Sequence, residues 1–333
     1  MEYSDLINKL FEGNTRAAAR LITIVENDIE AAEKITNFLY KHTGKAYILG
    51  ITGAPGTGKS TFISTLTRRF VNQEKKVGII CVDPTSPISG GALLGDRIRM
   101  KENFNLKNVF IRSMANRGQL GGLARATEDV IKILDAYGCD IIIIETVGVG
   151  QSEVDVFKSA QTVVVLLVPG LGDDIQAIKA GIMEITDIFV VNKMDSPGAD
   201  RKISEITQML ELRSSFKYQT QQASENYAKL KAWTPEIVKV NSKSGENFEL
   251  LLEVIEKHKE FLQKTGAISY YLKNRIKSET LEILKHKLQK KVEDLLYSNQ
   301  KEIEKYITKV IEKSLDPYSM ADLVIKMLGK EKS

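Results

Sequence analysis

A glycine-rich segment near residue 50 carries the residue types that hold phosphate groups. The stretch ITGAPGTGKST contains the spacing Gly53-x-x-x-x-Gly58-Lys59-Ser60. Its glycines let backbone N–H groups converge on phosphates, and the start of a helix adds its positive end. Lys59 would then reach the β- and γ-phosphates, while the Ser60 hydroxyl would bind Mg²⁺. The predicted phosphate site consists of Gly53, Ala54, Pro55, Gly56, Thr57, Gly58, Lys59, Ser60 and Thr61.

A second polar segment has the residue types that distinguish guanine from adenine. Asn192-Lys193-x-Asp195 ends the β-rich run VVNKMD. Asp195 could accept both the N1–H and the N2 amino hydrogens of guanine, which adenine does not offer side by side. Asn192 would brace the site, and the Lys193 stem would lie along the base. A site built on such hydrogen bonds rejects the analogue that lacks them by roughly 10⁴-fold.

A third segment, VNSKSGEN, follows another β-rich run and supports the guanine site. Its Asn241-Ser242-Lys243 stands where GTPases carry Ser-Ala-Lys. We expect the backbone N–H of Ser242 to contact guanine O6, and a backbone contact tolerates the departure at the first two positions. The bound nucleotide is therefore predicted to be GTP or GDP.

Several carboxylates are candidates for the metal and the γ-phosphate. Glu145-x-x-Gly148, in IIIIETVGVG, stands where nucleotide hydrolases carry Asp-x-x-Gly. Glu145 would hold Mg²⁺ through water, together with Ser60, and the Gly148 N–H would sense the γ-phosphate. Asp83 ends the run GIICVD and Asp96 lies in SGGALLGDRIRM, so both are further metal candidates. The alternative is ordinary helix capping, which a lone Asp after a strand often provides.

The residue that orients the attacking water is missing from its usual place. Small GTPases carry a Gln directly after the conserved Gly, whereas Val149 follows Gly148 here. Gln151 lies three positions past Gly148, on a switch-like segment that also holds Glu153 and Asp155. We therefore predict slow intrinsic hydrolysis until a partner or a moving loop completes the site.

These motifs lie between elements that the hydrophobic pattern predicts. Residues 1–44 have helical periodicity, and seven β-rich runs follow: AYILGIT, KVGIICVD, NVFIRSM, DIIIIETV, TVVVLLVPG, DIFVVNK and EIVKVNS. Helical patterns lie between most of them, which is typical of a mostly parallel sheet covered on both faces. From about Ile268 the chain is helical to its closing segment SMADLVIKML. We predict an α/β fold with an N-terminal helical extension (1–44), a nucleotide domain (45–265) and a C-terminal helical extension (266–333).

The composition indicates which kinds of binding partner and which cellular compartment to expect. The 333 residues include 47 basic and 43 acidic residues, a net charge of +4, which is too balanced to indicate nucleic acid or a membrane surface. No apolar run reaches the roughly 18 residues of a membrane span. Cys81 and Cys139 lie in or beside apolar runs. We therefore expect both to be core residues without a disulfide, in a protein of a reducing compartment. The histidines, His42, His258 and His286, are isolated in the sequence. The start, MEYSDLINKL, has no signal pattern, so we expect a cytoplasmic protein.

Together, segments from most of the chain resemble the MeaB/ArgK-type GTPases associated with methylmalonyl-CoA mutase. The resemblance rests on GNTRAAARLIT, HTGKAYILGITGAPGTGKST, VDPTSPISGGALLGDRIRM, RSMANRGQLGGLARAT, ETVGVGQSEVDV, VPGLGDDIQAIKAGIMEITDIFVVNKMD and DPYSMADLVIKML. It implies the fold class of signal-recognition and nickel-insertion GTPases, and a homodimer built by the C-terminal helices. It also implies a chaperone of an adenosylcobalamin-dependent acyl-CoA mutase that gates cofactor loading, protection or reactivation.

The resemblance also implies a signalling role for PGLGDDIQAIK as a switch loop. Asp173, Asp174 and Lys179 are its candidate residues, although Lys179 fits a solvated helix position equally well. The sequence departs from the family pattern at Asn241-Ser242 and in its Lys-rich C-terminal region.

Four other functions fit the sequence less well than this one. An ATP-dependent kinase linked to amino-acid transport conflicts with the guanine motif and with the lack of a kinase catalytic loop. A metal-insertion GTPase needs metal ligands that the scattered His and Cys residues do not supply. Partitioning ATPases carry an extra Lys where Ala54-Pro55 stands. A scaffold without turnover conflicts with intact Lys59, Ser60 and Glu145, but the missing Gln leaves it open.

Overall fold

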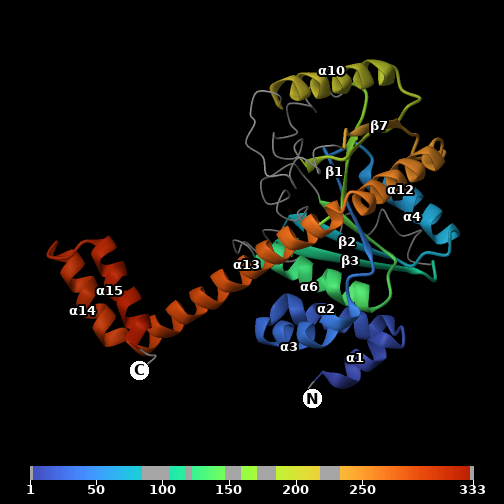
Figure 1. Ribbon diagram of the computed structural model, residues 1–333. Helices are drawn as coiled ribbons and strands as arrows, with labels where there is room; N and C mark the ends of the chain where they lie inside the picture. Colours follow the sequence, from blue (N-terminus) through green and yellow to red (C-terminus); the bar gives the residue numbers. More distant parts are fainter. Residues whose placement is uncertain are drawn as a thin grey trace. The chain divides into compact units, whose positions relative to one another are not determined.

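The structure is a computed structural model that describes residues 3–84, 106–116, 122–146, 159–170, 185–217 and 233–330. The chain divides into two compact units, Met1–Arg275 and Ile276–Ser333. The first holds the N-terminal helices and the sheet, and the second is helical (Figure 1). The limits predicted from the sequence, 1–44, 45–265 and 266–333, stay a prediction.

The sheet of the first unit confirms the predicted α/β fold. Its strands within the described residues are β1 (Tyr47–Gly53), β2 (Val77–Pro84), β3 (Val109–Asn116), β4 (Ile141–Thr146), β5 (Thr162–Leu167), β6 (Ile188–Val191) and β7 (Glu236–Lys239). They form a seven-stranded sheet in the order β3-β2-β4-β1-β5-β6-β7, and every pair is parallel. All seven β-rich runs of the sequence are strands of this sheet. Their carboxyl ends therefore share one edge, where the predicted motifs follow β1, β4, β6 and β7.

Helices cover both faces of the sheet. The helices described in the first unit are α1 (Ser4–Phe11), α2 (Thr15–Asn27), α3 (Ile29–Leu39), the 3₁₀ turn η1 (Tyr40–His42), α4 (Lys59–Asn72), α6 (Gly122–Ala136), α10 (Ala199–Lys217) and α12 (Phe248–Lys264). Phe62 and Phe248 bring α4 and α12 against one face. Ile131 and Ile206 bring α6 and α10 against the other. Because both faces are covered, β1, β4, β5 and β6 are buried along their whole length.

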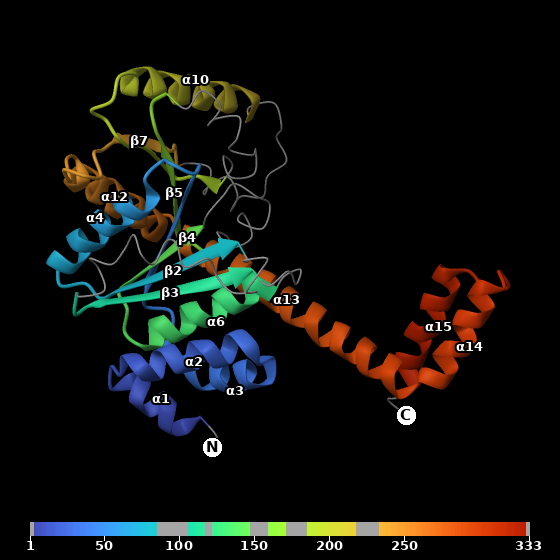
Figure 2. The same cartoon turned by 180° about the vertical axis from the view of Figure 1, so that it is seen from behind.

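The N-terminal helices α2 and α3 pack mainly on α6 (Figures 1 and 2), and Arg112 of β3 also bonds to Thr23 and Glu26 of α2. Asn14 and Asp28 cap α2 and α3 through their side chains. The Asp135 carboxylate of α6 then accepts the N–H groups of Gly44, Lys45 and Ala46. This clamp fixes the path from the N-terminal helices into β1, and so into the phosphate loop.

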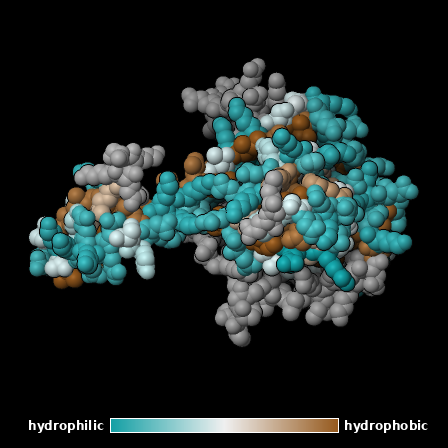
Figure 3. Space-filling model, turned by 90° about the horizontal axis from the view of Figure 1, so that it is seen from below, coloured by the Kyte–Doolittle hydropathy of each residue, from teal (hydrophilic) through white to brown (hydrophobic). Residues whose placement is uncertain are grey.

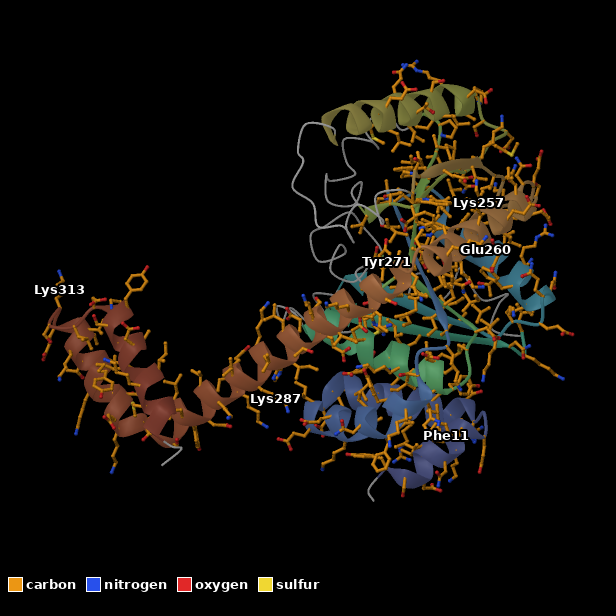
Figure 4. The ribbon with its side chains drawn as sticks, in the orientation of Figure 1. Phe11, Lys257, Glu260, Tyr271, Lys287 and Lys313 are labelled. Carbon is orange, nitrogen blue, oxygen red and sulfur yellow. The ribbon has the colours of Figure 1, made fainter. Side chains whose placement is uncertain are left out.

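The second unit is built from α13 (Ala267–Ser298), α14 (Gln300–Ile311) and α15 (Pro317–Lys330), of which α13 begins in the first unit. Its small core contains Leu295, Ile303 and Val324. Leu281, Leu284 and Leu288 of α13 are exposed. Hydrophobic residues are visible among the polar surface in Figure 3, while charged side chains such as Lys287 and Lys313 point outward in Figure 4. Within the described residues, no helix combines the length and apolar character needed to cross a bilayer.

Candidate nucleotide site

The phosphate loop connects β1 to α4 in the arrangement that the sequence predicts. Gly53 ends the strand, and Lys59 is the first residue of the helix. Gly58 has a φ of 88°, and a Cβ there would lie 2.8 Å from the Asn192 amide nitrogen. A Cβ on Gly53 would lie 2.5 Å from the Leu166 carbonyl oxygen. Both positions therefore require glycine, because the loop runs directly against β5 and the segment after β6.

The Lys59 ammonium group is held at this loop. Its Nζ donates to the carbonyl oxygens of Gly53 at 2.7 Å and Ala54 at 3.2 Å, and the residue is 7% exposed. The Thr57 hydroxyl donates to the same Ala54 carbonyl at 2.8 Å. These bonds fix the loop and the charge together, so that the ammonium is preorganised beside the place where phosphates would bind.

Two predicted metal-binding groups lie near the same edge of the sheet. Glu145 is the penultimate residue of β4, in register with Ile51 of β1 and Cys81 of β2, and is 1% exposed. The Cys81 thiol donates to Glu145 Oε2 at 3.7 Å. Ser60 lies in the first turn of α4 and is buried. These are oxygen donors, which suit Mg²⁺. Within the described ranges, no group of three or more His, Cys, Asp or Glu residues could hold a metal ion.

Other predicted residues are placed only in part. Asp83 lies at the carboxyl end of β2, level with Ala115 of β3, and its side chain is not described. The predicted positions outside the described residues are Asp96, Gly148, Gln151, Glu153, Asp155, Asp173, Asp174 and Lys179. The residues that sense the γ-phosphate and position water therefore stay predictions.

Asn192 joins the phosphate loop to the segment after β7, and both Asn192 and that segment are predicted to read guanine. Its Nδ2 donates to the Thr57 carbonyl at 2.8 Å. Its Oδ1 accepts the Ser242 N–H at 3.1 Å and the Ser242 hydroxyl at 2.7 Å. The side chain is almost fully buried, at 2% exposure for the residue. The three segments thus form one site around a buried amide, whose bonds are worth more for lying out of water.

The other residues predicted to read guanine are hydrogen-bonded to the same segments. Lys193 has a φ of 56°, and its Nζ donates to the Gly56 carbonyl at 3.1 Å. Asp195 is exposed, and its Oδ1 accepts the Asn241 amide at 2.9 Å. The Ser242 N–H, predicted to contact guanine O6, donates to Asn192 Oδ1, and its contact with a base stays a prediction.

Helix α4 supports the segment after β7 that is predicted to contact the base, and the sequence did not reveal this support. The Thr65 hydroxyl donates to the Ser242 carbonyl at 2.8 Å. Arg69, one turn further along α4, donates to the Gly245 carbonyl at 3.2 Å and pairs with Glu249 at 2.5 Å. The only signal in the sequence is a pair of polar residues four apart on the predicted phosphate helix, which is common on solvated faces.

A buried polar network lies at the opposite, amino edge of the sheet and was also missed. His258 of α12 binds the Thr162 hydroxyl through Nδ1 at 2.7 Å, and its Nε2 lies 3.5 Å from Asp187 Oδ1. The Tyr47 hydroxyl bonds to Thr162. Burial raises the pKa of Asp187 to about 7 and lowers the pKa of His258 to about 4. This histidine is isolated in the sequence but not in the fold, and it lies outside the nucleotide site.

Comparison with known proteins identifies the family. The family described as methylmalonyl Co-A mutase-associated GTPase MeaB matches residues 18–296. The chain belongs to the MeaB family. A Pyrococcus horikoshii protein provisionally named a GTPase is 50% identical over 327 residues, covering 98% of both chains. A Mus musculus protein named methylmalonic aciduria type A homolog, mitochondrial, is 30% identical over 343 residues, covering 96% of this chain and 78% of that protein.

A solved structure confirms the fold class. The crystal structure titled LAO/AO transport system kinase superposes with a TM-score of 0.64 and 21% identity, covering 98% of this chain and 97% of that chain. At this identity the likeness shows the fold alone, so the word kinase in its title says nothing of the activity of this chain. Family membership and fold together make this MeaB-family protein a P-loop GTPase, as the sequence predicts.

Proposed function

We propose that this protein binds GTP and GDP at the carboxyl edge of its sheet and couples GTP hydrolysis to an adenosylcobalamin-dependent acyl-CoA mutase. The proposed binding of guanine nucleotides rests on the hydrogen bonds of Asn192. A single buried side chain hydrogen-bonds the phosphate loop at Thr57 and the base-reading segment at Ser242. The groups proposed to bind the phosphates and the base are thereby linked through one side chain, and the exposed Asp195 lies three residues further along the chain.

The chemistry follows from the groups at the loop. Lys59 would neutralise charge on the β- and γ-phosphates, and the N-terminus of α4 would bind their oxygens. Mg²⁺ fits the oxygen donors present, with Ser60 and Glu145 as its holders and with Asp83 and Asp96 as further candidates. When bound, the ion neutralises charge between the β- and γ-phosphates. Gly148 and Gln151 are proposed for the γ-phosphate and the water, and hydrolysis is proposed to be slow without a partner.

The partner proposal rests on family and relatives. The family description names methylmalonyl-CoA mutase, and the mouse relative is named for methylmalonic aciduria. We therefore propose that this chain gates cofactor loading, or protects or reactivates such a mutase, in the cytoplasm. Neither a nucleic acid nor a membrane is part of this proposal.

A homodimer through the C-terminal helices belongs to the same proposal. Leu281, Leu284 and Leu288 are exposed on α13 at spacings that place them on one helix face. A second copy of the chain would cover this face. Light scattering of the purified protein, which gives its mass in solution, tests this state.

The first experiment is calorimetric titration with GTP, GDP and ATP in the presence of Mg²⁺. The wild type is expected to prefer guanine nucleotides by roughly 10⁴-fold. Asp195→Ala should lose this preference, whereas Glu12→Ala, which removes an exposed carboxylate at the end of α1, should keep it. Equal binding of ATP by the wild type would contradict the guanine assignment.

The partner is tested next with a purified adenosylcobalamin-dependent mutase. GTP turnover of the wild type, measured with and without the mutase, should rise when the mutase is added. Unchanged turnover together with no co-elution of the two proteins would contradict the partner proposal, and it would leave the guanine site intact.

A further inference from the structure

The two residues that depart from the usual Ser-Ala pattern both bind the guanine-reading segment. Asn241 donates to Asp195, and Ser242 donates to Asn192. We propose that Asn241 is a positioning residue for base selectivity, whose amide holds the Asp195 carboxylate in the orientation that reads guanine. This inference rests on the proposed guanine site and assigns a new role within it.

The Asn241 amide is itself fixed in orientation. Its Oδ1 accepts the N–H groups of Lys243 at 3.0 Å and Ser244 at 3.2 Å, which close the turn after β7. The backbone of Asn241 is paired as well, with its N–H donating to the Glu246 carbonyl. With the oxygen end anchored in the turn, the nitrogen end faces Asp195 at 2.9 Å. An amide suits this position because it accepts at one end and donates at the other.

Holding Asp195 leaves it able to read the base. An ionised carboxylate has about four lone-pair positions, and Asn241 uses one of them. Both oxygens therefore stay available for the N1–H and N2 amino groups of guanine. Asp195 is otherwise exposed, so a fixed partner reduces the rotamer freedom that binding would have to remove.

Ser242 extends the same support to the second guanine-reading residue. Its hydroxyl and its N–H both donate to Asn192 Oδ1, whose amide nitrogen is bound to Thr57. The departures from Ser-Ala thus add donors toward Asp195 and Asn192 together. The Asn241-Ser242 pair, which departs from the usual pattern in the sequence, therefore hydrogen-bonds both Asp195 and Asn192 in the fold.

The test compares GDP with inosine diphosphate, which lacks the N2 amino group that Asp195 would bind. Asn241→Asp is the informative variant, because it keeps the oxygen that closes the turn and replaces the donor with a carboxylate facing Asp195. The wild type should prefer GDP to inosine diphosphate by roughly tenfold. In Asn241→Asp the GDP affinity should fall by roughly 10- to 100-fold, and the preference should largely disappear.

Three further variants complete the test. Asn241→Ser, with a hydroxyl donor, should keep most of the preference. Ser244→Ala, in the same turn but without a bond to Asp195, should match the wild type. If Asn241→Asp does not fold, Asn241→Ala replaces it and should show the same loss of GDP affinity and of preference over inosine diphosphate. The double variant Asn241→Ala/Asp195→Ala should bind GDP no more weakly than Asp195→Ala alone, since Asn241 acts through that carboxylate.

The outcomes separate this inference from the proposed function. A wild type that prefers GDP, with a folded Asn241→Asp that keeps the full GDP preference, overturns the positioning role alone. Equal losses of GDP and inosine diphosphate, or failure of both Asn241→Asp and Asn241→Ala to fold, reduce Asn241 to a structural role and also overturn it. A wild type with no preference for GDP over ADP overturns the guanine site itself.

Discussion

The buried pair Asp187–His258 predicts opposite pH dependences of stability for two single variants. In the folded protein, burial moves the Asp187 pKa from 3.8 to about 7 and the His258 pKa from 6.5 to about 4. Each shift means that the folded and unfolded chains bind different numbers of protons over part of the pH range. The free energy of unfolding must then change with pH across that part.

The signs follow from which state holds the proton. Between pH 4 and 7 folded Asp187 retains a proton that the unfolded chain has lost, so its contribution to stability is lost as pH rises to about 7. A shift of about three units corresponds to ~4 kcal/mol. Between pH 4 and 6.5 unfolded His258 binds a proton that the folded chain lacks, so its contribution grows with pH by ~3 kcal/mol. In the wild type the two slopes largely cancel.

Removing either partner should expose the other slope. The unfolding free energy of Asp187→Asn minus that of the wild type should rise by ~4 kcal/mol from pH 4 to pH 7. The unfolding free energy of His258→Gln minus that of the wild type should fall by ~3 kcal/mol from pH 4 to pH 6.5. Differences between variant and wild type cancel the contributions of all other titrating groups, so that the sign of each change is diagnostic.

Urea unfolding at several pH values measures both changes. Trp233 is the only tryptophan of the chain, and its ring lies 4.6 Å from the His258 ring, so its fluorescence reports on this region directly. The exposed Asp322→Asn serves as the matched control substitution. Curves for Asp187→Asn and His258→Gln that run parallel to the wild type from pH 4 to 7 would refute the reasoning, because they would mean that the pair has ordinary pKa values.

Two further perturbations follow from buried contacts. Arg275→Met should lower the unfolding free energy by roughly 3 kcal/mol in urea titrations, because it leaves the buried Glu128 carboxylate, 2.7 Å from Arg275 Nε, without this partner. The double variant with Glu128→Gln should recover much of the loss, and no recovery would contradict the ion-pair explanation. Asn192→Ala should weaken GDP binding at least 10-fold by calorimetry, since it breaks bonds to Thr57 and Ser242 at once. Unchanged binding would show that the two segments are held together by other contacts.

The sequence was sufficient for the sheet because the strands are continuous apolar runs. β4 is IIIIET and β5 is TVVVLL, both buried along their whole length, and only a parallel sheet covered on both faces requires that pattern. The start of α4 at Lys59 was equally predictable, because the phosphate loop fixes where its helix begins. These features depend on neighbours in the chain, which is why a sequence reveals them.

Long-range side-chain contacts were not predictable in the same way. His258 looks isolated because Thr162 lies 96 residues away in the chain, and only the packing of α12 on the sheet brings them together. The bond from the Ser242 N–H to Asn192 could not be predicted for a related reason. Its acceptor, the Asn192 side chain, lies 50 residues earlier, and no local pattern specifies which way the turn after β7 will face.

Helix α4 links the phosphate loop to the segment after β7 that is proposed to bind the base. Its N-terminus presents Lys59 and Ser60 to the phosphate loop, while Thr65, further along the same helix, holds the Ser242 carbonyl of the base-reading segment. Asn192 closes the ring by joining that segment back to the loop. A nucleotide that pulls on the loop through its phosphates must therefore also act on the groups that read its base. We therefore propose that selectivity for guanine depends on the whole ring of contacts, of which Asp195 is the member proposed to bind the base.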